Sequence, residues 1–163
     1  MSREITTADR RLLTADFARS SRLALDAGFD AIELHMGHGY LLSQFFSTHV
    51  NQRSDGYGGS LANRGRFWLE TLEQLRAAVG DDCAIATRIP VNGREGLPGI
   101  ETDDMLALIT MASPLVDLFD VNVGPWEEDS GTSRYYPEGH ERPWTDLVRQ
   151  ATDQAVVGVG RYT

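Results

Sequence analysis

AIELHMGHGY, residues 31–40, begins as a short apolar run and ends in two histidines on a glycine-bearing turn. We expect residues 29–34 to form a buried strand. His35 and His38 follow this strand three residues apart, and glycines flank the second histidine. In an α/β barrel the active site is built from the loops at the carboxyl ends of the strands. The stretch therefore predicts the catalytic rim of such a barrel.

Helices and short apolar strands alternate along the rest of the chain. Strands are expected at residues 29–34, 84–89, 118–123 and 155–159, and helices at residues 7–27, 41–46, 60–80, 102–111 and 143–148. Thr7 and Thr102 are the expected N-caps of two helices. Such alternation is typical of a parallel sheet covered by helices. Because the chain stops where the fourth strand ends, we expect half of a (β/α)8 barrel, whose usual length is ~250 residues. The alternative is a small, doubly wound open sheet.

Composition restricts the class of protein. The 163 residues suffice for one domain with one core. A net charge of −9 argues against a nucleic-acid binder, because such proteins usually present a basic face. No apolar run approaches the ~20 residues that a membrane-spanning helix needs, and residues 1–11 lack the apolar core of a secretion signal. The single cysteine, Cys83, is expected to be a small packed residue, and a reducing, cytoplasmic setting is expected.

The histidine pair is the first candidate for chemistry. Two neutral imidazoles can each donate a hydrogen bond to a substrate atom, or one can act as an acid while the other orients it. The pair can instead be two satisfied polar residues in a loop. Metal ligation by His35 and His38 is less favoured, because no third ligand lies nearby in the sequence. We therefore predict catalytic histidines and no metal site.

Charged and aromatic residues follow the other three strands. Arg88 lies at the end of an apolar strand and must meet a carboxylate, a phosphate or an electron-rich ring; an internal salt bridge is equally compatible. Gly160 and Arg161 close the last strand, where barrels commonly bind phosphate, although the glycine also suits a plain strand ending. Trp126 and Asp129 suit an alkylated amine, but by composition alone a solvated acidic loop with one packed aromatic ring is the favoured explanation.

Several motifs together resemble the Old Yellow Enzyme family of FMN-dependent oxidoreductases. They are H-x-x-H after a strand, Y-G-G-S-x-x-N-R at the start of a helix, and the arginine of the next strand. The further motifs DCAIATR, W-x-E-D-x-G-x-S-R-x-Y, G-H-x-x-P-W and V-x-G-V-G-R-Y-T resemble the trimethylamine and dimethylamine dehydrogenase branch. The resemblance implies a partial TIM barrel in which residues 1–163 are strands 4 to 7, with their helices, of a single FMN-binding domain.

The resemblance also implies roles for individual residues. Arg88 is expected by the flavin's N1–C2 carbonyl edge, and Gly160 and Arg161 at the FMN phosphate. His38 matches the active-site histidine of the branch and Asp129 its carboxylate partner. Trp126 is expected to be substrate-binding, as one wall of the aromatic bowl for the alkylammonium group. His35 departs from the branch, which has tyrosine there, whereas histidine is common in the wider family.

The function implied is oxidative N-demethylation of a small alkylated amine by hydride transfer to flavin. One alternative is an ene-reductase, an NAD(P)H:flavin oxidoreductase that reduces activated alkenes, which His35 favours. Another is an inactive, truncated half barrel. An iron–sulfur cluster is expected, if anywhere, in a full-length parent outside this chain. A small-molecule substrate is the expected partner, with no nucleic acid and no membrane, and open strand edges are compatible with a homo-oligomer.

Overall fold

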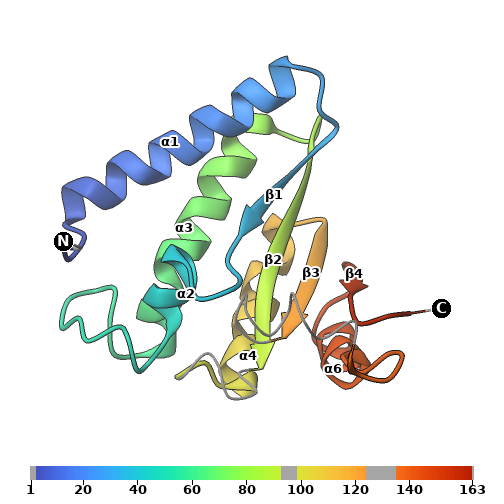
Figure 1. The fold of residues 1–163 in the computed structure, drawn as a ribbon. Helices are drawn as coiled ribbons and strands as arrows, with labels where there is room; N and C mark the ends of the chain where they lie inside the picture. The colour runs from blue at the N-terminus through green and yellow to red at the C-terminus, as the bar shows by residue number, and fades with distance from the viewer. Residues whose placement is uncertain (1–2, 93–98, 124–134, 163) are drawn as a thin grey trace.

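A four-stranded parallel sheet, with strands in the order β1-β2-β3-β4, is the centre of the fold (Figure 1). The computed structural model describes residues 3–92, 99–123 and 135–162. The strands are β1 (Ala31–His35), β2 (Ala84–Asn92), β3 (Leu118–Val123) and β4 (Ala155–Gly158). The helices are α1 (Thr7–Asp26), α2 (Leu41–Phe46), α3 (Leu61–Val79), α4 (Thr102–Ala112), the 3-10 turn η1 (Ser113–Leu115) and α6 (Arg142–Ala151). The predicted α/β architecture is therefore confirmed.

The order of the strands distinguishes a barrel segment from a doubly wound sheet. Each strand pairs with the next one in the sequence, and the direction of winding never reverses. A doubly wound sheet has a point at which the strand order reverses and carries helices on both faces. Here the helices cover one face: Trp68 of α3 donates a hydrogen bond to the hydroxyl of Thr87 in β2 (3.2 Å). The sheet is thus an arc of a (β/α)8 barrel.

Burial alternates along the strands, as it must when helices cover only one face. The covered face carries the core residues Leu34, Ile85, Ile89, Phe119 and Val121, each at most 2% exposed. The opposite face, which is the inner face of the barrel arc, carries exposed Glu33 and Val157. Alternate residues of each strand therefore pack against the helices, while the residues between them face the inside of the barrel arc, where a ligand can bind.

The helix ends differ in detail from the expectations. Thr6, not Thr7, is the N-cap of α1, and it forms a capping box with Asp9 in which each side chain accepts a hydrogen bond from the other residue's backbone N–H. Glu101 precedes α4 as its N-cap, while the Thr102 hydroxyl donates to the Val91 carbonyl of β2 (3.0 Å). Thr102 therefore ties α4 to the sheet instead of capping it.

Cys83 is 1% exposed and packs in the core, as predicted.

In the described part of the chain, no helix is long and apolar enough to span a bilayer. Figure 1 also shows α1 lying along α3, and α1 contacts β1 as well, so the two helices lie side by side.

The Y-G-G-S-x-x-N-R segment, residues 57–64, anchors the loop after α2 to α3. Ser60 caps α3 by accepting from the Asn63 N–H (3.3 Å). Arg64, 7% exposed, donates to the carbonyls of Phe46 (2.9 Å) and Gly59 (2.6 Å) and pairs with Asp104 of α4. One guanidinium therefore connects α2, the loop and α4, and this part of the family signature serves the scaffold.

Arg64→Lys should destabilise the protein by about 2–4 kcal/mol, because a lysine cannot reproduce the fork and leaves buried carbonyls without a donor. The denaturant midpoint of the intact protein measures this loss. Arg66→Lys is the matched control, since Arg66 lies two residues away on the exposed side of the same helix. Equal, small effects of the two substitutions would show that Arg64 does not connect these elements.

Candidate active site

The pairing register of the strands aligns three polar residues across the inner face of the sheet. His35 of β1 pairs with Arg88 of β2, and Arg88 pairs with Asp120 of β3. The turn with His38 follows β1, and Gly160 and Arg161 follow β4. Because all four strands are parallel, these groups lie at one edge of the sheet. The structure thus brings together His35, His38, Arg88 and the turn after β4.

The two imidazoles contact each other directly. Nδ1 of His38 lies 3.2 Å from Nε2 of His35, and the ring centroids are 5.1 Å apart. Burial lowers the pKa of His35 below its ordinary value, and the neighbouring His38 and Arg88 lower it further. A neutral His35 can share one proton with His38 and still present a donor or an acceptor to a ligand. The pair is therefore suited to hydrogen bonding and proton transfer.

The turn that carries the histidines is held from three sides. The Met36 N–H donates to the Arg88 carbonyl (2.8 Å), which continues the pairing of β1 with β2 beyond the strand. From α2, the Ser43 hydroxyl donates to the Met36 carbonyl and the Gln44 amide donates to the Gly39 carbonyl (2.9 Å). These contacts hold His38 at a φ of 58°, a left-handed conformation uncommon for residues other than glycine.

Gly37 is required by a close approach of β3. A Cβ atom at this position would lie 2.3 Å from Oδ1 of Asn122, a residue that is 0% exposed. The same atom would lie 3.1 Å from Cε1 of His35. The glycine therefore allows the histidine turn to pack against the third strand.

Arg88 has an internal carboxylate partner. Its Nε lies 3.3 Å from Oδ2 of Asp120, and both side chains are partly buried. Glu33 approaches the same carboxylate across Ala86, its small register partner in β2. Burial, followed by the charge of Asp120, raises the pKa of Glu33, and a hydrogen bond between the two side chains adds to the rise. The inner face thus holds Arg88 in a network of one cation and two carboxyl groups.

The turn after β4 has an uncommon backbone conformation. Gly160 and Arg161 are consecutive residues with positive φ, 108° and 58°. The Gly139 N–H donates to the carbonyls of Gly160 (2.8 Å) and Arg161 (3.2 Å), and the Arg161 guanidinium donates to the Tyr136 carbonyl (3.2 Å). A sharp backbone turn beside a guanidinium, at the end of a barrel strand, fits a phosphate group.

Two predicted residues cannot be placed. Trp126 and Asp129 lie outside the described residues, so the roles predicted for them stay predictions. Two residues were missed: Glu33 and Asp120 were not predicted as part of the site. The signal was present, since Glu33 and His35, like Asp120 and Asn122, are separated by two positions and share a face of a strand.

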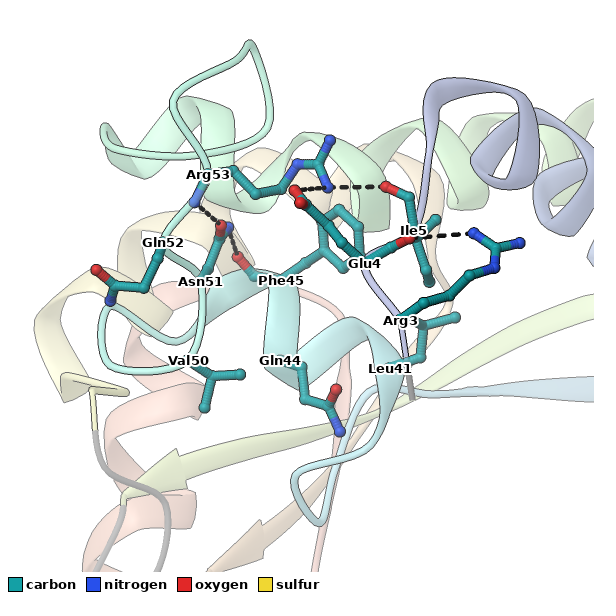
Figure 2. A pocket seen from close by; sticks show the side chains of 10 residues that line it. All are labelled: Arg3, Glu4, Ile5, Leu41, Gln44, Phe45, Val50, Asn51, Gln52 and Arg53. Carbon is teal, nitrogen blue, oxygen red and sulfur yellow. Dashed lines mark hydrogen bonds and ion pairs between the residues drawn. The ribbon is translucent and has the colours of Figure 1, made fainter. Parts of the chain in front are cut away.

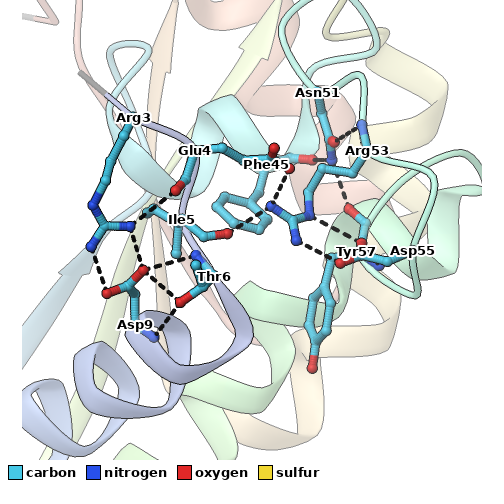
Figure 3. Close-up of polar contacts among 10 residues, drawn as sticks. All are labelled: Arg3, Glu4, Ile5, Thr6, Asp9, Phe45, Asn51, Arg53, Asp55 and Tyr57. Carbon is cyan, nitrogen blue, oxygen red and sulfur yellow. Dashed lines mark hydrogen bonds and ion pairs between the residues drawn. The ribbon is translucent and has the colours of Figure 1, made fainter. Parts of the chain in front are cut away.

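A separate cavity of about 360 Å³ lies between the N-terminal segment and α2 (Figure 2). It is lined by Arg3, Glu4, Ile5, Leu41, Gln44, Phe45, Val50, Asn51, Gln52 and Arg53. None of the predicted site residues is among them. Figure 3 shows that Arg53 is already engaged by Glu4, Asp55 and the Ile5 carbonyl. Because its main cation is used internally, we assign no ligand to this cavity.

Across the described ranges, no cluster of three or more histidine, cysteine, aspartate or glutamate side chains has the arrangement of a metal site.

Comparison with known proteins places these features in context. Residues 1–163 match the model of the NADH:flavin oxidoreductase / NADH oxidase family. The chain is 46% identical over 154 residues to dimethylamine dehydrogenase from Hyphomicrobium sp. (strain x), covering 92% of this chain and 21% of that protein. The structure of histamine dehydrogenase from Rhizobium sp. 4-9 superimposes with a TM-score of 0.90 at 36% identity, covering 99% and 24%. That of 6-hydroxypseudooxynicotine amine oxidase from Pseudomonas geniculata N1 gives 0.89 at 38%, also covering 99% and 24%.

Gly37→Ala should displace Asn122 and loosen the histidine turn, with a loss of about 1–3 kcal/mol as for other overpacked core sites. The melting temperature of the intact protein and the imidazole NMR signals of the site report the two effects. Gly56→Ala is the matched control, because a Cβ atom there meets nothing within 4 Å. A Gly37→Ala protein as stable as the control would contradict the close approach.

The lowered pKa of His35 predicts a pH dependence of stability. The unfolded chain protonates this ring near the ordinary value of 6.5, whereas the folded protein protonates it only at lower pH. The stability that comes from the neutral ring is therefore complete above pH 6.5 and is lost as the pH falls below it. His35→Gln should reduce the loss of unfolding free energy between neutral and mildly acidic pH.

The exposed His49 provides the control, because His49→Gln should leave that pH dependence as it is in the unmodified protein. Denaturation curves at several pH values give the comparison. Identical slopes for the unmodified and His35→Gln proteins would contradict the assignment.

Proposed function

Because the chain belongs to the NADH:flavin oxidoreductase / NADH oxidase family, we propose that the protein is an FMN-dependent dehydrogenase of small alkylated amines. The chain spans about a fifth to a quarter of the length of the amine-oxidising relatives it matches. The proposal therefore concerns the protein as a whole, with this chain contributing one arc of its barrel and part of its active site.

The observation that carries the proposal is the alignment of His35, Arg88 and Asp120 at the same sheet edge as the turn after β4. A planar, anionic cofactor needs a cation beside its ring and an anion site for its phosphate. Arg88 supplies the first, and Gly160 with Arg161 supplies the second. Bound FMN would supply a two-electron acceptor for the oxidation of the amine.

The chain's own residues would bind the cofactor and control protonation. Arg88, balanced by Asp120, provides a fixed positive charge that stabilises negative charge on a neighbouring ring. His35 and His38 share a hydrogen bond, so a proton can be held or passed at their ring nitrogens. Amine oxidation needs a free nitrogen lone pair, and the neutral ring of His35 can accept a hydrogen bond from the N–H of an alkylated amine.

Trp126 and Asp129 complete the proposed substrate site. A tryptophan face and a carboxylate together favour an alkylammonium group over a neutral carbonyl. Relatives named for the oxidation of dimethylamine and histamine support the choice of an amine. We further propose that the protein works in the cytoplasm, that a full-length parent carries any iron–sulfur cluster outside this chain, and that the protein can form a homo-oligomer.

The second candidate is an ene-reductase, and a specific observation favours it. His35 and His38 lie close enough to act on one carbonyl or nitro oxygen, as reduction of an activated alkene requires. An assay with dimethylamine and with cyclohexenone, using the intact, flavin-loaded protein, distinguishes the two activities. We expect turnover of the amine; turnover of cyclohexenone alone would replace the first candidate with the second.

Asp129→Asn should lower kcat for amine oxidation by about tenfold or more, because a carboxylate that pairs with the active-site histidine would be lost. Steady-state assays over a pH range, with an artificial electron acceptor, measure the effect. Asp153→Asn, at an exposed aspartate, is the control. Unchanged turnover of every N-methyl amine by Asp129→Asn would remove this residue from the mechanism.

A further inference from the structure

A short turn, residues 136–141, lies against the predicted phosphate turn and fixes its shape. We call it the clamp. Arg161 adopts a φ of 58°, which is unfavourable for a residue with a side chain. Such a conformation persists only when neighbouring groups impose it. The clamp supplies these groups: the Gly139 N–H binds two carbonyls of the phosphate turn, and the Tyr136 carbonyl accepts from the Arg161 guanidinium.

The side chain that supports Gly160 is that of His140. A Cβ atom on Gly160 would lie 3.0 Å from Cε1 and 3.1 Å from Nδ1 of His140, so the imidazole lies directly against the glycine backbone. The side chain of His140 is only 4% exposed, although it belongs to a surface turn. Burying a polar ring is unfavourable in free energy, so its position beneath a backbone turn indicates a structural role.

The imidazole lies against three other residues of the clamp, and its contact with Glu141 becomes an ion pair only when the ring is protonated. Its Nδ1 donates to the Pro137 carbonyl (3.1 Å), since a carbonyl can only accept. Its Nε2 lies 3.4 Å from Oε1 of Glu141, whose side chain is 2% exposed. The ring of Tyr136 stacks on it, with centroids 5.3 Å apart and planes at 25°. The ring of His140 is thus buried and lies in contact with both the clamp and Gly160.

We propose that His140 is a positioning residue for the phosphate of FMN: its buried ring holds Gly160 and Arg161 in the conformation that receives the phosphate. The proposal rests on the proposed function, because it requires that this turn binds the phosphate. It assigns a role to a histidine that the sequence alone did not single out. A glycine suits this position, because a φ of 108° is rarely adopted by residues with a side chain and a Cβ atom would crowd the imidazole.

The test compares FMN with riboflavin, which has the same ring but no phosphate. Dissociation constants of both are measured for the flavin-free intact protein by quenching of flavin fluorescence. The dissociation constant of riboflavin divided by that of FMN measures how much the phosphate contributes to binding. His140→Gln should lower that ratio by about tenfold, which is the loss of one well-placed interaction with a charged group. The affinity for riboflavin should stay within about twofold of the unmodified protein, because the ring site is separate.

Two further variants keep the test decisive. His49→Gln makes the same substitution at an exposed histidine outside the clamp and should leave the ratio unchanged. Tyr136→Leu removes the ring that stacks on His140, at a position that is 43% exposed and so tolerant of change. It should lower the ratio in the same direction by a smaller factor, and it decides the question if His140→Gln does not fold.

The outcomes separate the two proposals. An unmodified protein that binds FMN and riboflavin equally would overturn the phosphate site, and with it the proposed function. A protein that discriminates between them, but whose His140→Gln and Tyr136→Leu variants discriminate equally well, would overturn only the role of His140. Equal losses of both affinities would also overturn that role, because they indicate general damage to the fold.

Discussion

The register of the parallel pairs β1–β2 and β2–β3 is the constraint on which the site depends. Pairing His35 with Arg88, and Arg88 with Asp120, puts an imidazole, a guanidinium and a carboxylate on one line across the sheet. A slip of one residue would move these groups to the covered face and expose the apolar residues between them. The hydrophobic core beneath the helices therefore determines which side chains line the opposite face. Only this register buries the apolar residues of each strand and also aligns its polar residues on the inner face.

Electrostatic balance follows from the same arrangement. Arg88 is partly buried and needs a counter-charge, which Asp120 provides. Glu33 then faces a carboxylate, and its burial together with that neighbouring negative charge raises its pKa. On the other side of Arg88, its positive charge helps to keep His35 neutral. A single guanidinium thus influences the protonation of the groups on either side of it.

Much of this could be predicted from the sequence, because the strands are short, apolar and separated by clear helical periods. The histidine turn and the glycine–arginine turn were expected at strand ends and lie there. The interaction of Glu33 with Asp120 was not predicted, since it joins the first strand to the third across Ala86, and only the register reveals it. His140 was missed for a similar reason: its significance comes from contacts with a turn twenty residues away. Local sequence patterns predict individual helices and strands, whereas the composition of a functional site depends on which helices and strands pack against each other.

The anchoring role of Arg64 and its loop has an evolutionary consequence. The most recognisable signature of the chain contributes architecture: Arg64 connects α2, the loop and α4, and it lies outside the row of His35, Arg88 and Asp120. A descendant that had lost every reacting group would still need this signature to fold. The family likeness therefore rests on two kinds of residue: those at the sheet edge, such as His35 and Arg88, and Arg64, whose contacts hold the scaffold together.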